Sequence, residues 1–263
     1  MSASIIIRTY HKDVAWLQVC LESIDKYCSG FREVIALLPK GDLALADWSC
    51  IERNEIGGMP FYAHAIDEQV SDGYIAQQVT KIYADTWTSA ENILFVDSDI
   101  VFFRHATPEN FMRHGKPFIM FTHYDKFPVD KDMPWKAITE KFMSHTVDYE
   151  FMRRLPSMYP TALLREIREF CQLTHNIGLL AYLKLVKDRE FSEFNAIGAY
   201  VYYHAPQHVH FIPTDSVSIT DAGRVWKPNE IPEPCAMQFW SWGNQDEQMA
   251  QAKRLIHGDA VEA

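Results

Sequence analysis

The sequence lacks the cysteine spacings that build a disulfide framework or a zinc site. Its five cysteines form no Cys-x-x-Cys pair and match no metal-ligand spacing, and an odd number of thiols cannot pair completely. We therefore expect free thiols in a reducing compartment. Cys20 and Cys171 fall on the apolar sides of predicted helices, which indicates small core residues.

The chain also lacks a long apolar run and a surplus of positive charge. The opening run, MSASIIIRTY, is too short for a signal peptide, and no stretch approaches the length of a membrane span. We expect a cytoplasmic protein. Lys and Arg number 25 against 35 Asp and Glu, a formal net charge of −10, which argues against general binding to nucleic-acid phosphates or anionic lipid. A phosphorylated substrate would have to be bound together with a cation.

The first forty residues predict a strand, a helix and a second strand. Ser4 to Ile7 is a β-branched run, and Asp13 is placed to cap a helix whose apolar residues recur at helical spacing. Phe31 to Leu38 then reads as the next strand. A βαβ unit of this kind has a right-handed crossover and begins a parallel sheet.

The most informative stretch is ILFVDSDIVFF, which spans Ile93 to Phe103. Its unbroken apolar run predicts a strand covered on both faces, and ligands of parallel sheets collect at the carboxyl ends of such strands. Asp97 and Asp99 are two residues apart, so in extended backbone they share a side and could hold one divalent cation. Two buried carboxylates without a partner would be costly, which favours a metal ion or a protonation shift.

The helix predicted before this strand, from Tyr74, has an apolar stripe that includes Ile75, Val79 and Ile82. Gln77, Gln78 and Lys81 fall off that stripe, which predicts a solvated face for them.

Later in the chain, Ser192 can cap a helix whose first turn contains Glu193, where the helix dipole also favours a carboxylate. Trp240 and Trp242 would lie side by side in extended backbone, where they suit stacking on a sugar or base and equally a core. Three histidines that precede or begin a predicted strand remain undecided as metal ligands: His204, His208 and His210.

Four segments occur in the chain order of glycosyltransferases with the GT-A fold, a superfamily that this sequence resembles: SIIIRTYHKD, VDSD, SEFNAIG and the C-terminal QFWSWG. The resemblance is greatest to small bacterial and phage-type members. It implies an α/β, Rossmann-like, mixed and mostly parallel sheet flanked by helices. One catalytic domain would span 1–255, with a nucleotide-sugar half at 1–122 and an acceptor half at 123–255, before a disordered tail at 256–263.

The resemblance also implies a metal-dependent transfer of a sugar from a nucleotide-sugar donor, with a UDP-sugar expected, to an acceptor hydroxyl. The acceptor would be a glycan, a lipid-linked glycan or a modified DNA base. Nucleic acid would then take part only as an acceptor. Mn²⁺ or Mg²⁺ would bind Asp97 and Asp99, and Glu193 would be the base of an inverting reaction or position substrate in a retaining one. The implied donor contacts are Arg8, Thr9, Tyr10, Lys81, Asp97, Ser98 and Asp99, and the implied acceptor contacts are Trp240 and Trp242.

Two other functions stay open. DSDIVF also fits the motif of haloacid-dehalogenase-type phosphatases, with Asp97 as nucleophile and Mg²⁺ bound, although that motif normally follows the first strand and here a complete βαβ unit precedes it. The second alternative is a non-catalytic carbohydrate-binding or nucleic-acid-binding module that uses Trp240 and Trp242.

Overall fold

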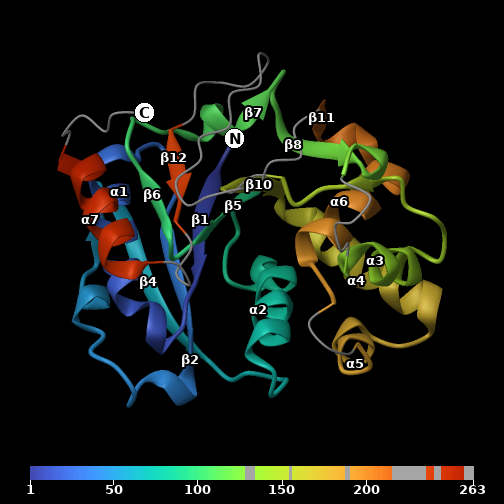
Figure 1. The fold of residues 1–263 in the computed structure, drawn as a ribbon, viewed down its shortest axis with the longest axis horizontal. Helices are drawn as coiled ribbons and strands as arrows, with labels where there is room; N and C mark the ends of the chain where they lie inside the picture. Colours follow the sequence, from blue (N-terminus) through green and yellow to red (C-terminus); the bar gives the residue numbers. More distant parts are fainter. Residues whose placement is uncertain (128–133, 154–155, 187–189, 215–234, 240–243, 258–263) are drawn as a thin grey trace.

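The structure is a computed structural model that describes residues 1–127, 134–153, 156–186, 190–214, 235–239 and 244–257. Within these residues, six strands form the central sheet in the order β10-β5-β1-β2-β4-β3 (Figure 1). Their bounds are β1 Ala3–Arg8, β2 Val34–Pro39, β3 Glu55–Ile56, β4 Met59–Ile66, β5 Asn92–Asp97 and β10 Ser157–Pro160. β5, β1, β2 and β4 run parallel, and β10 and β3 are antiparallel to their neighbours. The predicted α/β class with a mixed, mostly parallel sheet is confirmed.

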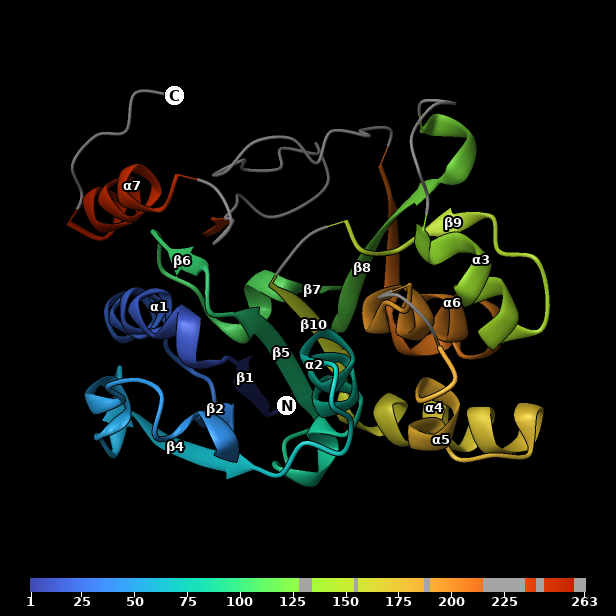
Figure 2. The ribbon, with the colours of Figure 1, turned by 60° about the horizontal axis from the view of Figure 1, so that its bottom comes forward.

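Helices cover both faces of this sheet (Figure 2). α1 and α7 lie on one side, and α2 and α4 to α6 lie on the other. The helix bounds are α1 Val14–Tyr27, α2 Gly73–Ile82, α3 Pro134–Met143, α4 Thr161–His175, α5 Leu179–Leu183, α6 Glu193–His204 and α7 Gln245–His257. Among the described helices, none is long and apolar enough to cross a membrane.

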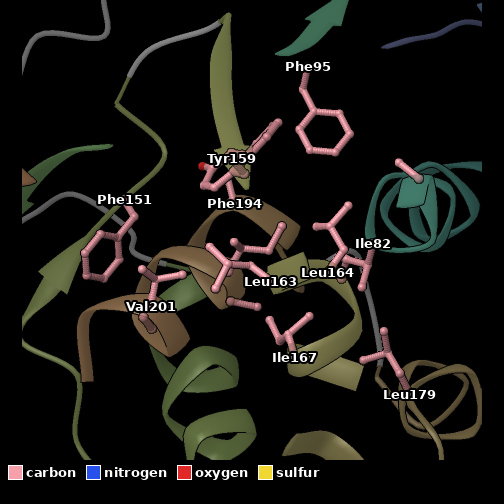
Figure 3. Packing of buried hydrophobic residues seen from close by; sticks show 14 of the residues in the cluster. Ile82, Phe95, Phe151, Tyr159, Leu163, Leu164, Ile167, Leu179, Phe194 and Val201 are labelled. Atoms are coloured by element: carbon pink, nitrogen blue, oxygen red, sulfur yellow. The ribbon is translucent and has the colours of Figure 1, made fainter. Parts of the chain in front are cut away.

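The two apolar layers follow from the alternation of side chains along each strand. Ile5 and Ile7 of β1 pack with α1, whereas Ile6 belongs to the layer on the α2 side. In that second layer, Phe95 of β5 lies 6.0 Å from Phe194 of α6 between ring centroids, edge to face. Figure 3 shows these rings above the apolar side chains of α4. β5 is therefore buried on both faces, as its continuous apolar run predicts.

In the part of the chain that the structure describes, two smaller strand groups lie beside the central sheet. β6 (Ile100–Phe102) pairs antiparallel with β12 (Ala236–Gln238), which brings the C-terminal region to the end of β5. β8 pairs with β7, β9 and β11, and only β11 is parallel to it. The bounds of this second group are β7 Met112–Arg113, β8 Lys116–His123, β9 Tyr149–Glu150 and β11 His210–Pro213.

Some boundaries differ from the sequence-based expectations. β2 begins at Val34 rather than Phe31. Phe31 precedes the strand, and its ring centroid lies 6.4 Å from that of Phe111 in the apolar layer that β2 shares with α1. α7 passes the expected domain end at residue 255 and continues to His257, because Ile256 is buried against α1. Residues 258–263 lie outside the described part of the chain.

Gly198 lies where α6 closely approaches Phe151. A Cβ at this position would lie 2.4 Å from Cβ and Cγ of Phe151. We predict that Gly198→Ala lowers the free energy of unfolding by about 1–2 kcal/mol, because a steric cost of about 2–3 kcal/mol, the upper part of the usual range for overpacking, exceeds the gain of about 1 kcal/mol in helix propensity. Urea denaturation measures this change. Gly41→Ala, with open space around the new Cβ, is the control, and an unchanged Gly198→Ala protein would contradict the packing described.

Candidate functional site

A cavity of about 520 Å³ opens at the carboxyl ends of the parallel strands. β1, β2, β4 and β5 each lead into residues of its wall, and α2 contributes a further side. This is the position at which parallel α/β sheets bind ligands. Its described lining consists of Arg8, Thr9, Tyr10, His11, Asp13, Pro39, Asp42, Glu68, Gly73, Tyr74, Gln77, Asp97, Ser98 and Asp99.

The loop after β1 supplies one wall of the cavity. The Arg8 guanidinium forms an ion pair with Glu68 and donates a hydrogen bond to the carbonyl oxygen of Thr9. Thr9 is buried, whereas Tyr10 is 39% exposed. The structure thus places all three predicted donor contacts on the cavity. It also adds a partner that sequence reasoning missed, because Glu68 lies beyond β4 and far from Arg8 in the chain.

The Asp97-Ser98-Asp99 turn supplies the neighbouring part of the wall, since Arg8 and Asp97 are partners on the paired strands β1 and β5. Asp97 accepts a hydrogen bond from Lys81 at 2.8 Å from Nζ to Oδ1, and its side chain is 20% exposed. Asp99 is held by the C-terminal region, since its carbonyl oxygen accepts from the backbone N–H of Phe239 at 2.8 Å. Gln238 lies 3.4 Å from its carboxylate, measured from Nε2 to Oδ1.

Asp97 and Asp99 fit the chemistry of the predicted cation. In the described part of the chain, no three His, Cys, Asp or Glu side chains are grouped to hold a metal ion by themselves. Mg²⁺ does not require such a cage, because it keeps several waters and binds through one or two carboxylates together with substrate phosphates. Two carboxylates on one wall of an open cavity satisfy that description.

Lys81 is not on a solvated face, so that prediction was wrong. Its side chain is 3% exposed, and its Nζ lies 2.8 Å from Asp97 Oδ1 and 3.0 Å from Glu193 Oε1. Gln78 is buried as well, and its Oε1 accepts from the backbone N–H of Glu193 at 2.8 Å. The cause is α6, which packs against the polar side of α2 and removes both side chains from solvent. Lys81 reaches the cavity wall through Asp97, and is not itself part of the described lining.

Glu193 occupies the predicted place at the start of α6. Ser192 caps the helix, because its Oγ accepts from the backbone N–H of Asn195. The Glu193 side chain is 3% exposed and contacts Lys81 rather than the cavity. Burial raises the pKa of Glu193, and the nearby Lys81 only partly offsets this effect. For Lys81 burial acts to lower the pKa, but Asp97 and Glu193 outweigh it and raise the pKa.

Asp13 is a cavity residue that the sequence suggested only as a helix cap. It precedes α1 but makes no side-chain capping bond. Ser98 Oγ instead donates to Asp13 Oδ2 at 3.3 Å. Burial, together with the charge of Asp97, raises the pKa of Asp13 to about 6, although the bond from Ser98 acts in the other direction. The available signal was the position of Asp13 in the same connection between strand and helix as Arg8 to Tyr10, three residues after Tyr10.

Three further candidates, His204, His208 and His210, do not belong to the described lining of the cavity. His204 and His208 are exposed, and His210 is half-buried with its ring 5.3 Å from that of His114. His208 lies in a short 3₁₀ helix, Pro206–His208, and only His210 belongs to a strand. Trp240 and Trp242 lie outside the described residues.

Removal of Lys81 alone should destabilise the protein, since it would leave two carboxylates without their shared partner. We predict that Lys81→Met lowers the free energy of unfolding by about 3–5 kcal/mol, the usual cost of leaving a buried charge without its partner. Urea denaturation at pH 7.5 provides the measurement. Lys253→Met on the exposed side of α7 is the control and should change stability by less than about 0.5 kcal/mol. A Lys81→Met protein as stable as the control would refute the buried ion pair.

Asp13 should make stability depend on pH. Its pKa is about 6 in the folded state against 3.8 for the ordinary carboxyl, so the folded state binds more protons between these values. Its contribution to the free energy of unfolding therefore falls as the pH rises through this window. We predict that Asp13→Asn gains about 1–2 kcal/mol over wild type between pH 4 and pH 7, in metal-free buffer. If the free energies of unfolding of the two proteins changed with pH in the same way, that result would contradict the raised pKa of Asp13.

No model of a known protein family matches the chain, and no curated protein sequence matches it either. The function is therefore inferred from the cavity and the residues around it. Those residues combine a buried Arg8 with a set of carboxylates at the ends of parallel strands.

Proposed function

We propose that this chain is a metal-dependent glycosyltransferase of the GT-A type, which moves a sugar from a nucleotide-sugar donor to an acceptor hydroxyl. One observation carries the proposal: a single cavity brings the Arg8-Thr9-Tyr10 loop together with the Asp97-Ser98-Asp99 turn. These segments are about ninety residues apart in the sequence, and β1 and β5 pair directly so that Arg8 lies opposite Asp97.

The charge of the cavity supports a requirement for a cation. Its described lining contains five carboxylates, against Arg8 and His11 as the basic side chains. Arg8 is already paired with Glu68, and His11 contacts Asp42 at 3.0 Å from Nδ1 to Oδ2. A diphosphate would meet net repulsion in such a site. A divalent cation on Asp97 and Asp99 would reverse that repulsion and stabilise the diphosphate as a leaving group.

The dimensions and the sheet also agree with this function. A volume of about 520 Å³ lies within the range of small-molecule and cofactor sites, which run from about 300 to 1,000 Å³. The parallel order β5-β1-β2-β4, with antiparallel β10 beside β5, is compatible with a GT-A sheet. Fold alone does not establish function, so the cavity residues carry the greater weight.

Different residues of the chain would bind the cation and the parts of the donor. Asp97 and Asp99 would hold the cation, with Asp99 anchored through its backbone to Phe239. Tyr10 exposes 39% of its surface and would offer a ring face to the nucleobase. The ion pair with Glu68 would hold Arg8 in a fixed orientation beside the donor. A UDP-sugar remains the expected donor, with a glycan, lipid-linked glycan or modified DNA base as acceptor.

The role of Glu193 as the base of an inverting reaction stays a prediction. Its carboxylate is 3% exposed and contacts Lys81. An acceptor hydroxyl would reach it only after the chain rearranges around Lys81 and Asp97. A positioning role needs no such rearrangement.

The two alternatives receive less support. A phosphatase with Asp97 as nucleophile would have its motif after β5, the fifth strand along the chain, rather than after the first. Metal-dependent hydrolysis of p-nitrophenyl phosphate that Asp97→Asn abolishes would favour it. The binding-module alternative depends on Trp240 and Trp242, which lie outside the described residues, and would require ligand binding that is indifferent to metal and nucleotide sugar.

The proposal predicts that donor binding requires both the cation and Asp99. In a thermal-shift panel of nucleotide sugars, one donor should raise the melting temperature with Mn²⁺ and have no effect with EDTA. Asp99→Asn should weaken that binding by about tenfold to a hundredfold, because a ligand to the cation is lost. Asp246→Asn, on the exposed first turn of α7, should behave as wild type. Donor binding of normal strength by Asp99→Asn without metal would rule out the proposed site.

A further inference from the structure

The Lys81 ammonium lies between two carboxylates that belong to different parts of the fold. Asp97 ends β5 at the cavity wall, and Glu193 begins α6 behind it. Nζ lies 2.8 Å from Asp97 Oδ1 and 3.0 Å from Glu193 Oε1. The three side chains form a continuous line from the interior to the cavity, in the order Glu193, Lys81, Asp97.

On the basis of the proposed metal-dependent function, we infer that Lys81 and Glu193 are positioning residues for Asp97. Lys81 orients the Asp97 carboxylate by binding one of its oxygens. Glu193 compensates the charge of Lys81, so that Asp97 keeps the negative charge with which it binds a divalent cation. Neither residue needs to touch the donor or the acceptor.

Asp97 is more exposed to solvent than its two partners. The Asp97 side chain is 20% exposed, whereas those of Lys81 and Glu193 are 3% exposed. The bond from Lys81 goes to Oδ1, which leaves Oδ2 as the oxygen without a bond from this lysine. Partners that bind the far side of a metal ligand orient it and tune its affinity, and their loss typically costs tenfold to a hundredfold in metal affinity.

The sum of charges explains why Glu193 is needed. Glu193, Lys81 and Asp97 together carry a charge of −1 when all three are ionised. Without the charge of Glu193 the sum becomes zero, and the ammonium would repel a cation held by Asp97. In a buried environment this repulsion is weakly screened, so its effect on affinity is large.

A purely structural role accounts poorly for the arrangement. Buried ion pairs contribute little net stability, and apolar residues of similar volume often replace them without loss. An apolar contact would suffice to join α2 to α6 here, since Phe194 already lies beneath the ammonium at 4.7 Å from Nζ to the ring centroid. Gln78 provides a second link between the same helices through the backbone of Glu193. The contact with Asp97 therefore gives Lys81 and Glu193 a role that an apolar contact between the helices would not supply.

The test compares three variants by their affinity for Mn²⁺ in the presence of UDP. Glu193→Gln keeps the shape of the side chain and removes its charge. The double variant Lys81→Met/Glu193→Gln removes both buried charges and returns the sum to −1. Glu169→Gln, on the exposed face of α4, is the matched control. Mn²⁺ electron paramagnetic resonance measures free and bound metal directly, without any transfer reaction, and isothermal titration measures UDP binding.

We expect Glu193→Gln to bind Mn²⁺ with UDP about tenfold more weakly than wild type. The double variant should recover part of that loss, and Glu169→Gln should match wild type. The double variant also serves if Glu193→Gln fails to fold, because it removes the two charges whose side chains are 3% exposed and leaves Asp97, which is 20% exposed, to bind the metal.

Other outcomes separate this inference from the proposed function. Equal Mn²⁺ affinity in wild type and Glu193→Gln overturns the inference alone, and loss of sugar transfer in that same variant would then favour Glu193 as the base. A double variant that binds Mn²⁺ more weakly than Glu193→Gln contradicts the charge compensation. If wild type binds neither Mn²⁺ nor any nucleoside diphosphate or nucleotide sugar, the proposed function fails and the inference fails with it.

Discussion

Burial of β5 on both faces is the constraint on which the rest of the structure depends. The apolar layers on its two sides fix the strand, so the direction in which its last residue, Asp97, leaves the sheet is fixed as well. The pairing with β1 places that residue opposite Arg8. An acidic turn and a basic loop thereby come to share one cavity through ordinary sheet geometry.

The strands and the acidic turn could be predicted because their signals are local. An apolar run covered on both faces identified β5, and the helical spacing after Asp13 identified α1. The environment of Lys81 could not be predicted, because its neighbours depend on how α6 packs against α2 from more than a hundred residues away. A lysine opposite an apolar stripe looks the same in the sequence whether water or a second helix covers it.

The same limit applies to the site. The carboxylate pair Asp97 and Asp99 was recognised from its spacing, whereas Glu68 became visible only when the sheet placed the end of β4 near Arg8. Asp13 was read as a helix cap because caps and cavity carboxylates use the same residue types at the same loop positions. Its hydrogen bond from Ser98 is a property of two segments that meet only in the folded chain.

The pairing of β12 with β6 makes the acidic turn depend on a segment that lies 139 residues further along the chain. Phe239 and Gln238 hold Asp99, and Ala252 and Ile256 of α7 complete the layer beneath them with α1. Contacts between segments so far apart in the chain cost loop-closure entropy and form late in folding, so the acidic turn gains this support only after the local elements have formed.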